Sequence, residues 1–113
     1  MRPDRVAAPA PPGDSSRSTF AATFDPRSIA LVGASADPGK NTARPLRSLR
    51  RHGYTGDVYP VNPHRDVVLG ETAYPTLSDV PVAVDHAFIM VPLRGVAGVV
   101  EECAQRGVPV ATI

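Results

Sequence analysis

The sequence predicts an α/β fold, in which a single domain is built on a doubly wound parallel sheet. Short apolar runs typical of buried strands alternate with stretches of helical periodicity. Their order is strand, helix, strand, short strand, strand, helix, strand. The chain has 113 residues, of which 42% are hydrophobic. That length allows one small core and argues against two full domains.

The first 19 residues differ in composition from the rest of the chain. They contain four prolines and almost no large apolar side chain. Such a segment cannot bury enough surface to offset the conformational entropy that is lost on ordering. We therefore expect a disordered tail over residues 1–19 and a folded domain over residues 20–113.

The folded part begins with a strand, a loop and a helix. Ser28–Val32 is a continuous apolar run that ends at a glycine, which is typical of a strand buried on both faces. After a loop over residues 33–40, we expect a helix that is capped by Asn41 or Thr42 and ends at His52.

Pro45 and Gly53 suit the first turn and the C′ position of this helix. Leu46 and Leu49 mark its inner face. The outward residues are four arginines: Arg44, Arg47, Arg50 and Arg51. These arginines are either ordinary exposed surface or a docking face for an acidic partner.

The second half of the domain adds further strands and one helix. The expected elements are strands at Asp57–Val61, 71–74, 86–91 and 108–113, and a helical turn or loop at 78–81. The helix precedes the last strand, ends at Gly107 and carries an apolar stripe. That stripe consists of Val96, Val99, Val100 and Cys103. Because no helix covers the last strand, an apolar sheet face would stay open to water. We therefore expect a domain that is incomplete at its C-terminus: a fragment, a truncated reading frame or a subunit that needs a partner.

Composition excludes several classes of function. With 12 basic and 11 acidic residues the net charge is +1, which gives no electrostatic case for nucleic acid as a partner. No apolar stretch reaches the about 18 residues that span a membrane, and no signal peptide is present, so we expect a cytoplasmic protein. Cys103 is the single cysteine, which excludes an internal disulfide and a cysteine-cluster metal site. Its place on a helical stripe favours a core residue over a nucleophile for thioester chemistry.

A parallel sheet binds ligands at the carboxyl ends of its strands. The first such end is the loop of residues 33–40, which leads into a helix N-terminus where free N–H groups favour a phosphate. The loop matches neither G-x-G-x-x-G nor the Walker A pattern, because Ser35 and Pro38 stand at glycine positions of the first and Asn41 follows Lys40 in the second. Lys40 is either a phosphate contact or a loop charge.

The end of the second strand distinguishes between nucleotides. NAD sites normally place an acidic residue there to hold the ribose diol. This chain has Asn62-Pro63-His64-Arg65 instead, which fits a ribose that carries a phosphate, as in NADP or coenzyme A. Arg65 suits a phosphate by its fork geometry, and His64 could assist it. The alternative is that both are solvated turn residues.

Three segments carry a family resemblance. They are VGASADP at the end of the first strand, YPVNP at the end of the second strand, and VDHAFIMVP at the central strand. Over residues 20–113 the chain resembles the N-terminal CoA-binding domain of the NDP-forming acyl-CoA synthetases. That group includes the ADP-forming acetate–CoA ligases and is related to the alpha subunit of succinyl-CoA synthetase. The resemblance implies a Rossmann-like fold and coenzyme A as the ligand.

The resemblance also assigns site residues. Those assigned to coenzyme A are Gly33, Ala34, Ser35, Pro38, Lys40, Asn41, Asn62, Pro63, His64, Arg65, Val91 and Pro92. Thr42 departs from the family, in which many members have glycine at the helix entry. No histidine of the chain matches the phosphohistidine context of a ligase, so we expect binding without catalysis. The remaining ligase domains or subunit would be the partner. The alternatives are a stand-alone CoA-binding regulatory protein and an NADP-binding oxidoreductase domain.

Overall fold

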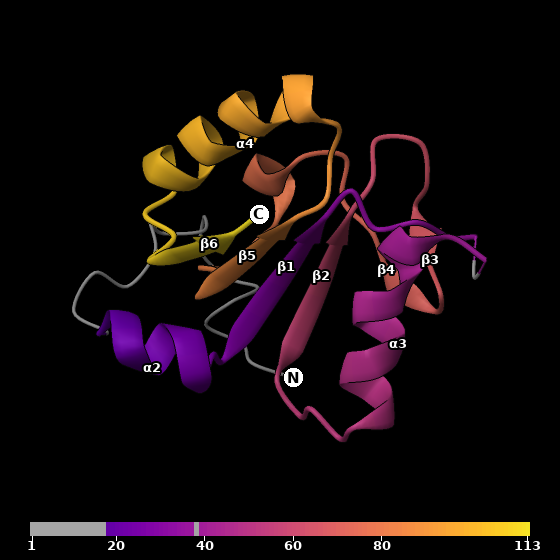
Figure 1. The fold of residues 1–113 in the computed structure, drawn as a ribbon, viewed down its shortest axis with the longest axis horizontal. Coiled ribbons are helices and arrows are strands. Elements are labelled where there is room, and N and C mark those ends of the chain that lie inside the picture. Colours follow the sequence, from indigo (N-terminus) through magenta and orange to yellow (C-terminus); the bar gives the residue numbers. More distant parts are fainter. Residues whose placement is uncertain (1–17, 38) are drawn as a thin grey trace.

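A computed structural model describes residues 18–37 and 39–113, and its centre is a four-stranded parallel sheet (Figure 1). The strands are β1 (Ser28–Val32), β2 (Asp57–Val61), β5 (His86–Ile89) and β6 (Val110–Thr112). Their order across the sheet is β2-β1-β5-β6, so the chain winds from β1 in one direction to β2 and in the other to β5 and β6. The predicted doubly wound parallel sheet is confirmed.

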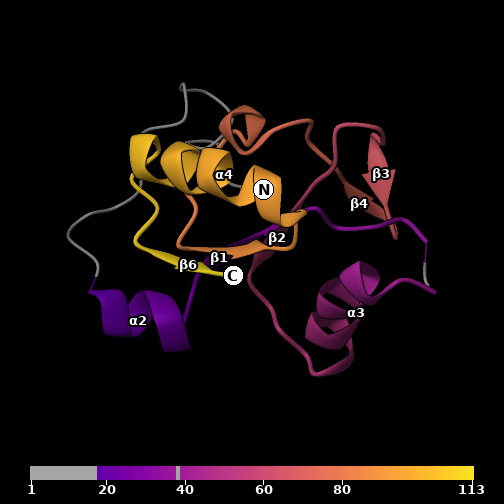
Figure 2. The same ribbon diagram turned by 45° about the horizontal axis from the view of Figure 1, so that its top comes forward.

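Helices cover both faces of this sheet (Figure 2). On one face, Leu46 of α3 (Arg44–Arg51) packs with Ile29 and Leu31 of β1. On the other face, α4 (Leu93–Gln105) packs Cys103 against alternate residues of the same strand. The strand residues are therefore apolar on both sides, which explains the continuous apolar runs in the sequence.

The predicted inner faces of the two helices are largely confirmed. Leu46 is buried and Leu49 is half-buried, while the four arginines of α3 are exposed. On α4, the side chains of Val96, Val99 and Cys103 pack against the core. Val100 was wrongly placed on this stripe: it is 41% exposed, because the stripe that faces the sheet is narrower than the periodicity indicated.

The start of α3 differs from the prediction. A 3-10 turn, Asn41–Ala43, precedes the helix, and Ala43 stands at its N-cap with no side-chain capping bond. The expectation that Asn41 or Thr42 caps the helix is wrong. The backbone makes the connection instead, since the N–H of Ala43 donates to the carbonyl of Lys40 at 3.1 Å.

The end of α3 is as predicted. Gly53 has a φ of +78°, a conformation that glycine adopts without strain. The N–H of Gly53 donates to the carbonyl of Arg50 at 3.3 Å, and that of Tyr54 to the carbonyl of Leu49 at 2.9 Å. This pair of bonds is the Schellman motif, which uses up carbonyls that the helix leaves free.

Sequence reasoning missed two short elements, a helix before β1 and the first strand of a hairpin. Helix α2 (Thr19–Phe24) begins at Ser18, whose Oγ accepts from the N–H of Ala21 at 3.0 Å. Strands β3 (Val67–Val68) and β4 (Glu71–Thr72) form a hairpin outside the main sheet. Of the disorder predicted for the first 19 residues, residues 1–17 lie outside the described part, whereas Ser18 and Thr19 belong to α2 and its cap.

The other boundaries differ by a few residues. The strand expected at 71–74 is shorter, with only a bridge between Tyr74 and Val61 beyond β4. The turn expected at 78–81 is a 3-10 helix at Leu77–Asp79. Both β5 and β6 are shorter than the apolar runs that contain them, because strand pairing stops before the apolar residues do.

The amino ends of β1 and β5 are joined by a buried carboxylate. Asp85 is 2% exposed, and its Oδ2 accepts from the backbone N–H of Arg27 at 2.8 Å and from the Nε of Arg27 at 3.1 Å. Ser28 adds a second link, since its Oγ donates to the carbonyl of Ala83 and accepts from the N–H of Asp85, each at 3.0 Å. A buried charge is tolerated here because it is paired and hydrogen-bonded.

Glycine is required at position 33, at the opposite end of β1, and the effect of replacing it on the free energy of unfolding can be measured. A Cβ at Gly33 would lie 2.8 Å from the carbonyl oxygen of Met90, and the φ of Gly33 is +92°. We expect Gly33→Ala to lower the free energy of unfolding by about 2–4 kcal/mol. In Gly98→Ala, where the new Cβ meets nothing within 4 Å inside α4, we expect a gain of about 0.5–1 kcal/mol. Urea unfolding of both variants is the measurement, and a neutral Gly33→Ala would contradict the packing argument.

The thiol of Cys103 gives a second prediction. Burial raises the pKa of this thiol above its usual range, and the negative charge of Glu102 raises it further. The reactive thiolate is therefore scarce in the folded state. We expect iodoacetamide to modify Cys103 at least about tenfold more slowly in the native protein than in denaturant at the same pH. Equal rates in the two states would show that Cys103 is accessible and reactive.

Candidate functional site

The three strand ends predicted to form the site do meet at one edge of the sheet. The N–H of Gly33, just after β1, donates to the carbonyl of Val61 at the end of β2, at 2.9 Å. On its other side, the backbone of Gly33 approaches Met90, which follows β5. The turn at Gly33 is thus wedged between the ends of β2 and β5, which is where the predicted site residues lie.

Asn62 connects two of these segments through its side chain. Its Nδ2 donates to the carbonyl of Ala34 at 3.0 Å, and its Oδ1 accepts from the N–H of His64 at 2.8 Å. Its backbone N–H donates to the carbonyl of Tyr74 at 2.9 Å. The resemblance assigned Asn62 to the ligand, whereas in the structure both ends of its amide are bonded within the protein.

The loop after Gly33 is shaped by its own hydrogen bonds. Ala34 is fully buried, and the N–H of Ser35 donates to the carbonyl of Thr42 at 3.4 Å. The Oγ of Ser35 accepts from the N–H of Asp37 at 3.0 Å. Asp37 Oδ1 in turn accepts from the N–H of Gly39 at 2.9 Å. Of the predicted loop residues, Gly33 and Ala34 therefore shape the backbone. Pro38 lies outside the described residues.

The charged residues of the predicted site face solvent. Lys40, His64 and Arg65 are all exposed, as are Asn41 and Pro63. Within the described part of the chain, neither Lys40 nor Arg65 has an ion-pair partner. Two cations without an ion-pair partner thus lie in the segments that follow β1 and β2, and such cations attract an anionic ligand.

The third segment contributes apolar surface. Val91 is half-buried and packs against the core beneath α4, while Pro92 is exposed and stands at the N-cap of that helix. Pro92 makes no side-chain capping bond. Val91 lies beside Gly33, and Pro92 follows it at the start of α4; their place in a ligand site stays a prediction.

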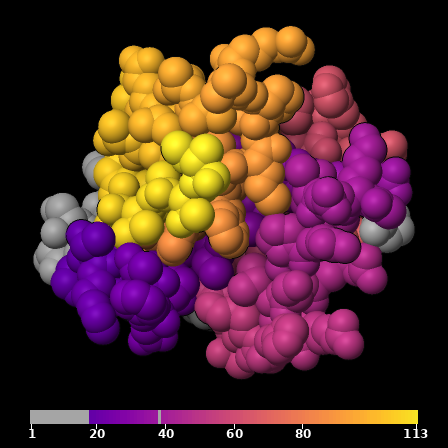
Figure 3. All heavy atoms as spheres, in the orientation of Figure 1, coloured from indigo at the N-terminus to yellow at the C-terminus, as the bar shows by residue number. Residues whose placement is uncertain are grey.

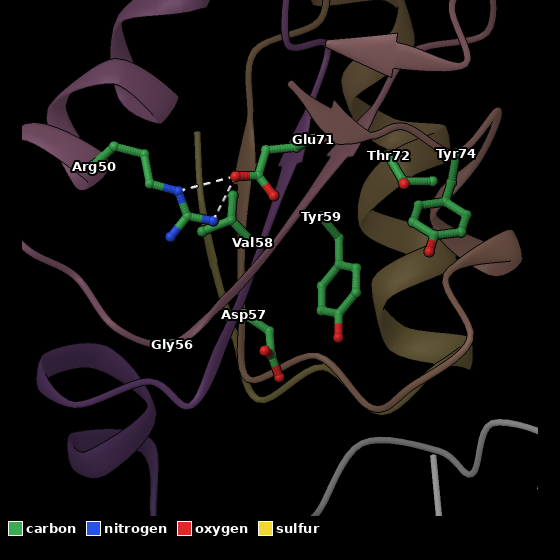
Figure 4. Close-up of a pocket in the computed structure, with 8 residues that line it drawn as sticks. All are labelled: Arg50, Gly56, Asp57, Val58, Tyr59, Glu71, Thr72 and Tyr74. Atoms are coloured by element: carbon green, nitrogen blue, oxygen red, sulfur yellow. Dashed lines mark hydrogen bonds and ion pairs between the residues drawn. The ribbon is translucent and has the colours of Figure 1, made fainter. Parts of the chain in front are cut away.

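A separate hollow of about 260 Å³ lies along the outer edge of β2. Figure 4 shows the Arg50–Glu71 ion pair, with 2.8 Å between Nη2 and Oε2, on one side of this hollow, and the rings of Tyr59 and Tyr74 away from that pair. None of the predicted site residues lines it. This hollow is therefore separate from the sheet edge that carries the predicted site residues.

Two further features limit the chemistry of the described residues. In residues 18–37 and 39–113, no three His, Cys, Asp or Glu side chains are grouped closely enough to hold a metal ion. No helix of that part of the chain is both long and apolar enough to cross a bilayer. The arrangement at the sheet edge is suited to holding an anion by backbone and cationic groups.

Comparisons with known proteins agree with this geometry. Residues 27–113 match the family model described as CoA binding domain. The chain is 42% identical over 90 residues to acetate–CoA ligase [ADP-forming] II of Archaeoglobus fulgidus, covering 80% of this chain and 13% of that protein. It is 40% identical over 100 residues to the alpha subunit of the Pyrococcus furiosus ADP-forming acetate–CoA ligase I, covering 81% of this chain and 21% of that subunit.

A solved structure shows the same fold. The dinucleotide-forming acetyl-coenzyme A synthetase 1 of Ca. Korarchaeum cryptofilum superimposes with a TM-score of 0.78 and 46% sequence identity, over 81% of this chain and 20% of that one. The chain therefore spans only 13% to 21% of the length of these relatives. It belongs to the family of Rossmann-like CoA-binding domains that is found in the ADP-forming acetate–CoA ligases.

Proposed function

We propose that this chain is the CoA-binding module of an ADP-forming acyl-CoA synthetase of the acetate–CoA ligase type. It would hold CoA, a substrate of that reaction, so that the CoA thiol reaches an acyl phosphate made elsewhere. The observation that carries this proposal is that Lys40 and Arg65, which have no ion-pair partner among the described residues, lie in two of the three loops that follow the strand ends, in a chain of the CoA-binding family.

Each segment has a proposed part of the ligand. The first N–H groups of the 3-10 turn that begins at Asn41, together with the charge of Lys40, would hold the diphosphate, because the start of a helical segment offers free N–H groups and a cation adds charge. Arg65, with His64 beside it, would hold the phosphate on the ribose. Val91 and Pro92 would border the rest of the CoA molecule. Such a module contributes to catalysis by positioning the thiol rather than by covalent chemistry.

We further propose that the missing steps belong to the remaining ligase domains or subunit. Most of the length of the relatives lies outside the matched region, so the acid substrate and the phosphorylated histidine would be supplied there. One face of this domain is suited to such a partner. The rings of Phe20 and Phe24 are each 74% exposed with centroids 4.9 Å apart, and Phe88 of β5 is 38% exposed.

This open face lies between α2 and α3 (Figure 3). Phe88 is in register with Leu31, so both point to the side of the sheet that α3 covers. The helix α3 covers β1 and β2, whereas α2 is the only element of the described residues that lies over β5 and β6 on this face (Figure 2). Both faces of a parallel sheet are normally covered, so the gap fits a helix from the ligase polypeptide.

Ligand binding tests the proposed function. We expect CoA to bind more tightly than dephospho-CoA, NADP or NAD, as measured by calorimetry. Arg65→Ala should weaken the affinity for CoA about tenfold and bring it close to the affinity for dephospho-CoA, because a charged hydrogen bond to the ribose phosphate is lost. The control is Arg51→Ala, which removes the same charge from the exposed side of α3 and should leave the affinity within about twofold. A preference for NADP would instead indicate a dinucleotide-binding oxidoreductase domain.

The open face is tested by co-purification. The probe is the Archaeoglobus fulgidus ligase from which its own matching N-terminal region has been removed. We expect it to retain this chain, and the charge introduced by Phe24→Asp should reduce the retention at least about tenfold because an aspartate is buried in the contact. Val67→Asp alters another exposed apolar residue, on the hairpin, and should have no effect. Absence of any complex would favour a stand-alone CoA-binding protein.

A further inference from the structure

The amide of Asn62 is the single side chain that joins the loop after β1 to the turn after β2 by hydrogen bonds among the described residues. Its donor end binds the carbonyl of Ala34, and its acceptor end binds the N–H of His64. Ala34 is 28 positions away in the sequence and fully buried, while His64 adjoins the exposed Arg65. One side chain therefore sets where the two segments lie relative to each other.

We propose that Asn62 is a positioning residue that couples the two phosphate-binding segments and does not itself touch the ligand. This inference rests on the proposed function, because it takes CoA as the molecule that spans both segments. A ligand that contacts two sites gains affinity when the protein holds those sites at the right separation in advance. Asn62 supplies that separation.

The chemistry of the position favours asparagine. The two partners are of opposite kinds, a carbonyl and an N–H, so the amide fits in one orientation only. Aspartate would place a carboxylate oxygen against the carbonyl of Ala34, where two acceptors repel. Serine could still accept from the N–H of His64, as serine and threonine do in turns, but it is too short to reach Ala34 as well. The Asn62→Ser variant therefore removes the bond to Ala34 while it keeps the bond to the N–H of His64 that shapes the turn.

The surrounding backbone keeps the amide in place. The N–H of Asn62 donates to the carbonyl of Tyr74, and the preceding carbonyl, that of Val61, accepts from Gly33. The residue is half-buried, and Pro63 follows it with a restricted φ. Because the main chain is held on both sides, the side chain has little freedom to turn toward a ligand.

The test compares a ligand that spans both segments with fragments that meet only one. CoA carries both the diphosphate and the ribose phosphate. Adenosine 3′-monophosphate carries only the second, and 4′-phosphopantetheine offers one phosphate to the loop. For Asn62→Ser we expect CoA affinity by calorimetry to fall about tenfold. The affinities of the two fragments, measured by NMR titration, should change by less than about twofold, because each segment remains intact.

Two variants control the interpretation. Asn62→Ala removes both bonds and should also speed amide exchange at His64, which Asn62→Ser should leave protected. Ser48→Ala, on the exposed side of α3, should change neither affinity nor exchange. Thermal melts of all variants establish that they are folded, and Asn62→Ser is the variant that preserves the local turn if Asn62→Ala does not fold.

Each outcome decides between the possibilities. If one fragment loses affinity by the same factor as CoA, Asn62 touches the ligand and the inference is wrong. If CoA affinity is unchanged in Asn62→Ser, the link to Ala34 does not matter and the inference is equally wrong. If the wild type binds none of the three ligands, the proposed function fails, and amide exchange at His64 still reports on the hydrogen bond that the Asn62 side chain makes there. Unchanged exchange at His64 in Asn62→Ala would then show that Asn62 does not order the turn, and the inference about Asn62 would be wrong as well.

Discussion

The tight turn at Gly33 is the constraint on which the proposed binding site, at the edge where β1, β2 and β5 end, depends. The backbone must leave β1 between the ends of two neighbouring strands, with its N–H on the carbonyl of Val61 and its Cα against the carbonyl of Met90. A side chain there would collide with main-chain atoms that cannot move without disturbing the sheet. The close approach brings the loop of residues 34–37 down beside β2. From there the carbonyl of Ala34 can reach Asn62.

Much of this architecture could be predicted from the sequence because it follows from periodicity. The central strands and the helices α3 and α4 have long enough apolar patterns to be recognised, and parallel topology then requires their carboxyl ends to meet. Helix α2 has six residues and strand β3 has two, which is too short for any periodic signal. That Lys40 and Arg65 lie in the segments after β1 and β2 could be predicted from the sequence. The hydrogen-bond partner of Asn62 could not be predicted, because only the folded structure shows that the carbonyl of Ala34, 28 residues away in the sequence, lies next to its side chain.

The distribution of charge explains how a nearly neutral chain can attract an anion. The net charge is only +1, and α3 carries four arginines with no acidic residue among them. Arg50 is compensated by Glu71, and Arg27 by the buried Asp85. Lys40 and Arg65 have no such partner within the described residues, so both side chains remain available to an anionic ligand. The pairing of individual charges, rather than the overall charge, therefore leaves these two cations for the proposed ligand.

The two halves of the sheet serve different purposes. The proposed site lies where β1, β2 and β5 end, and the residues that shape it are buried or hydrogen-bonded to the backbone, as Ala34 and Asn62 are. The exposed aromatic residues instead belong to α2 and to the part of β5 that α3 does not cover. The contacts that order the proposed site are thus separate from the exposed aromatic surface that we propose for a partner. A domain organised in this way can keep one ligand geometry while it is joined to different catalytic domains. The same CoA-binding region recurs in relatives where it forms between about an eighth and a fifth of the chain, which fits that separation.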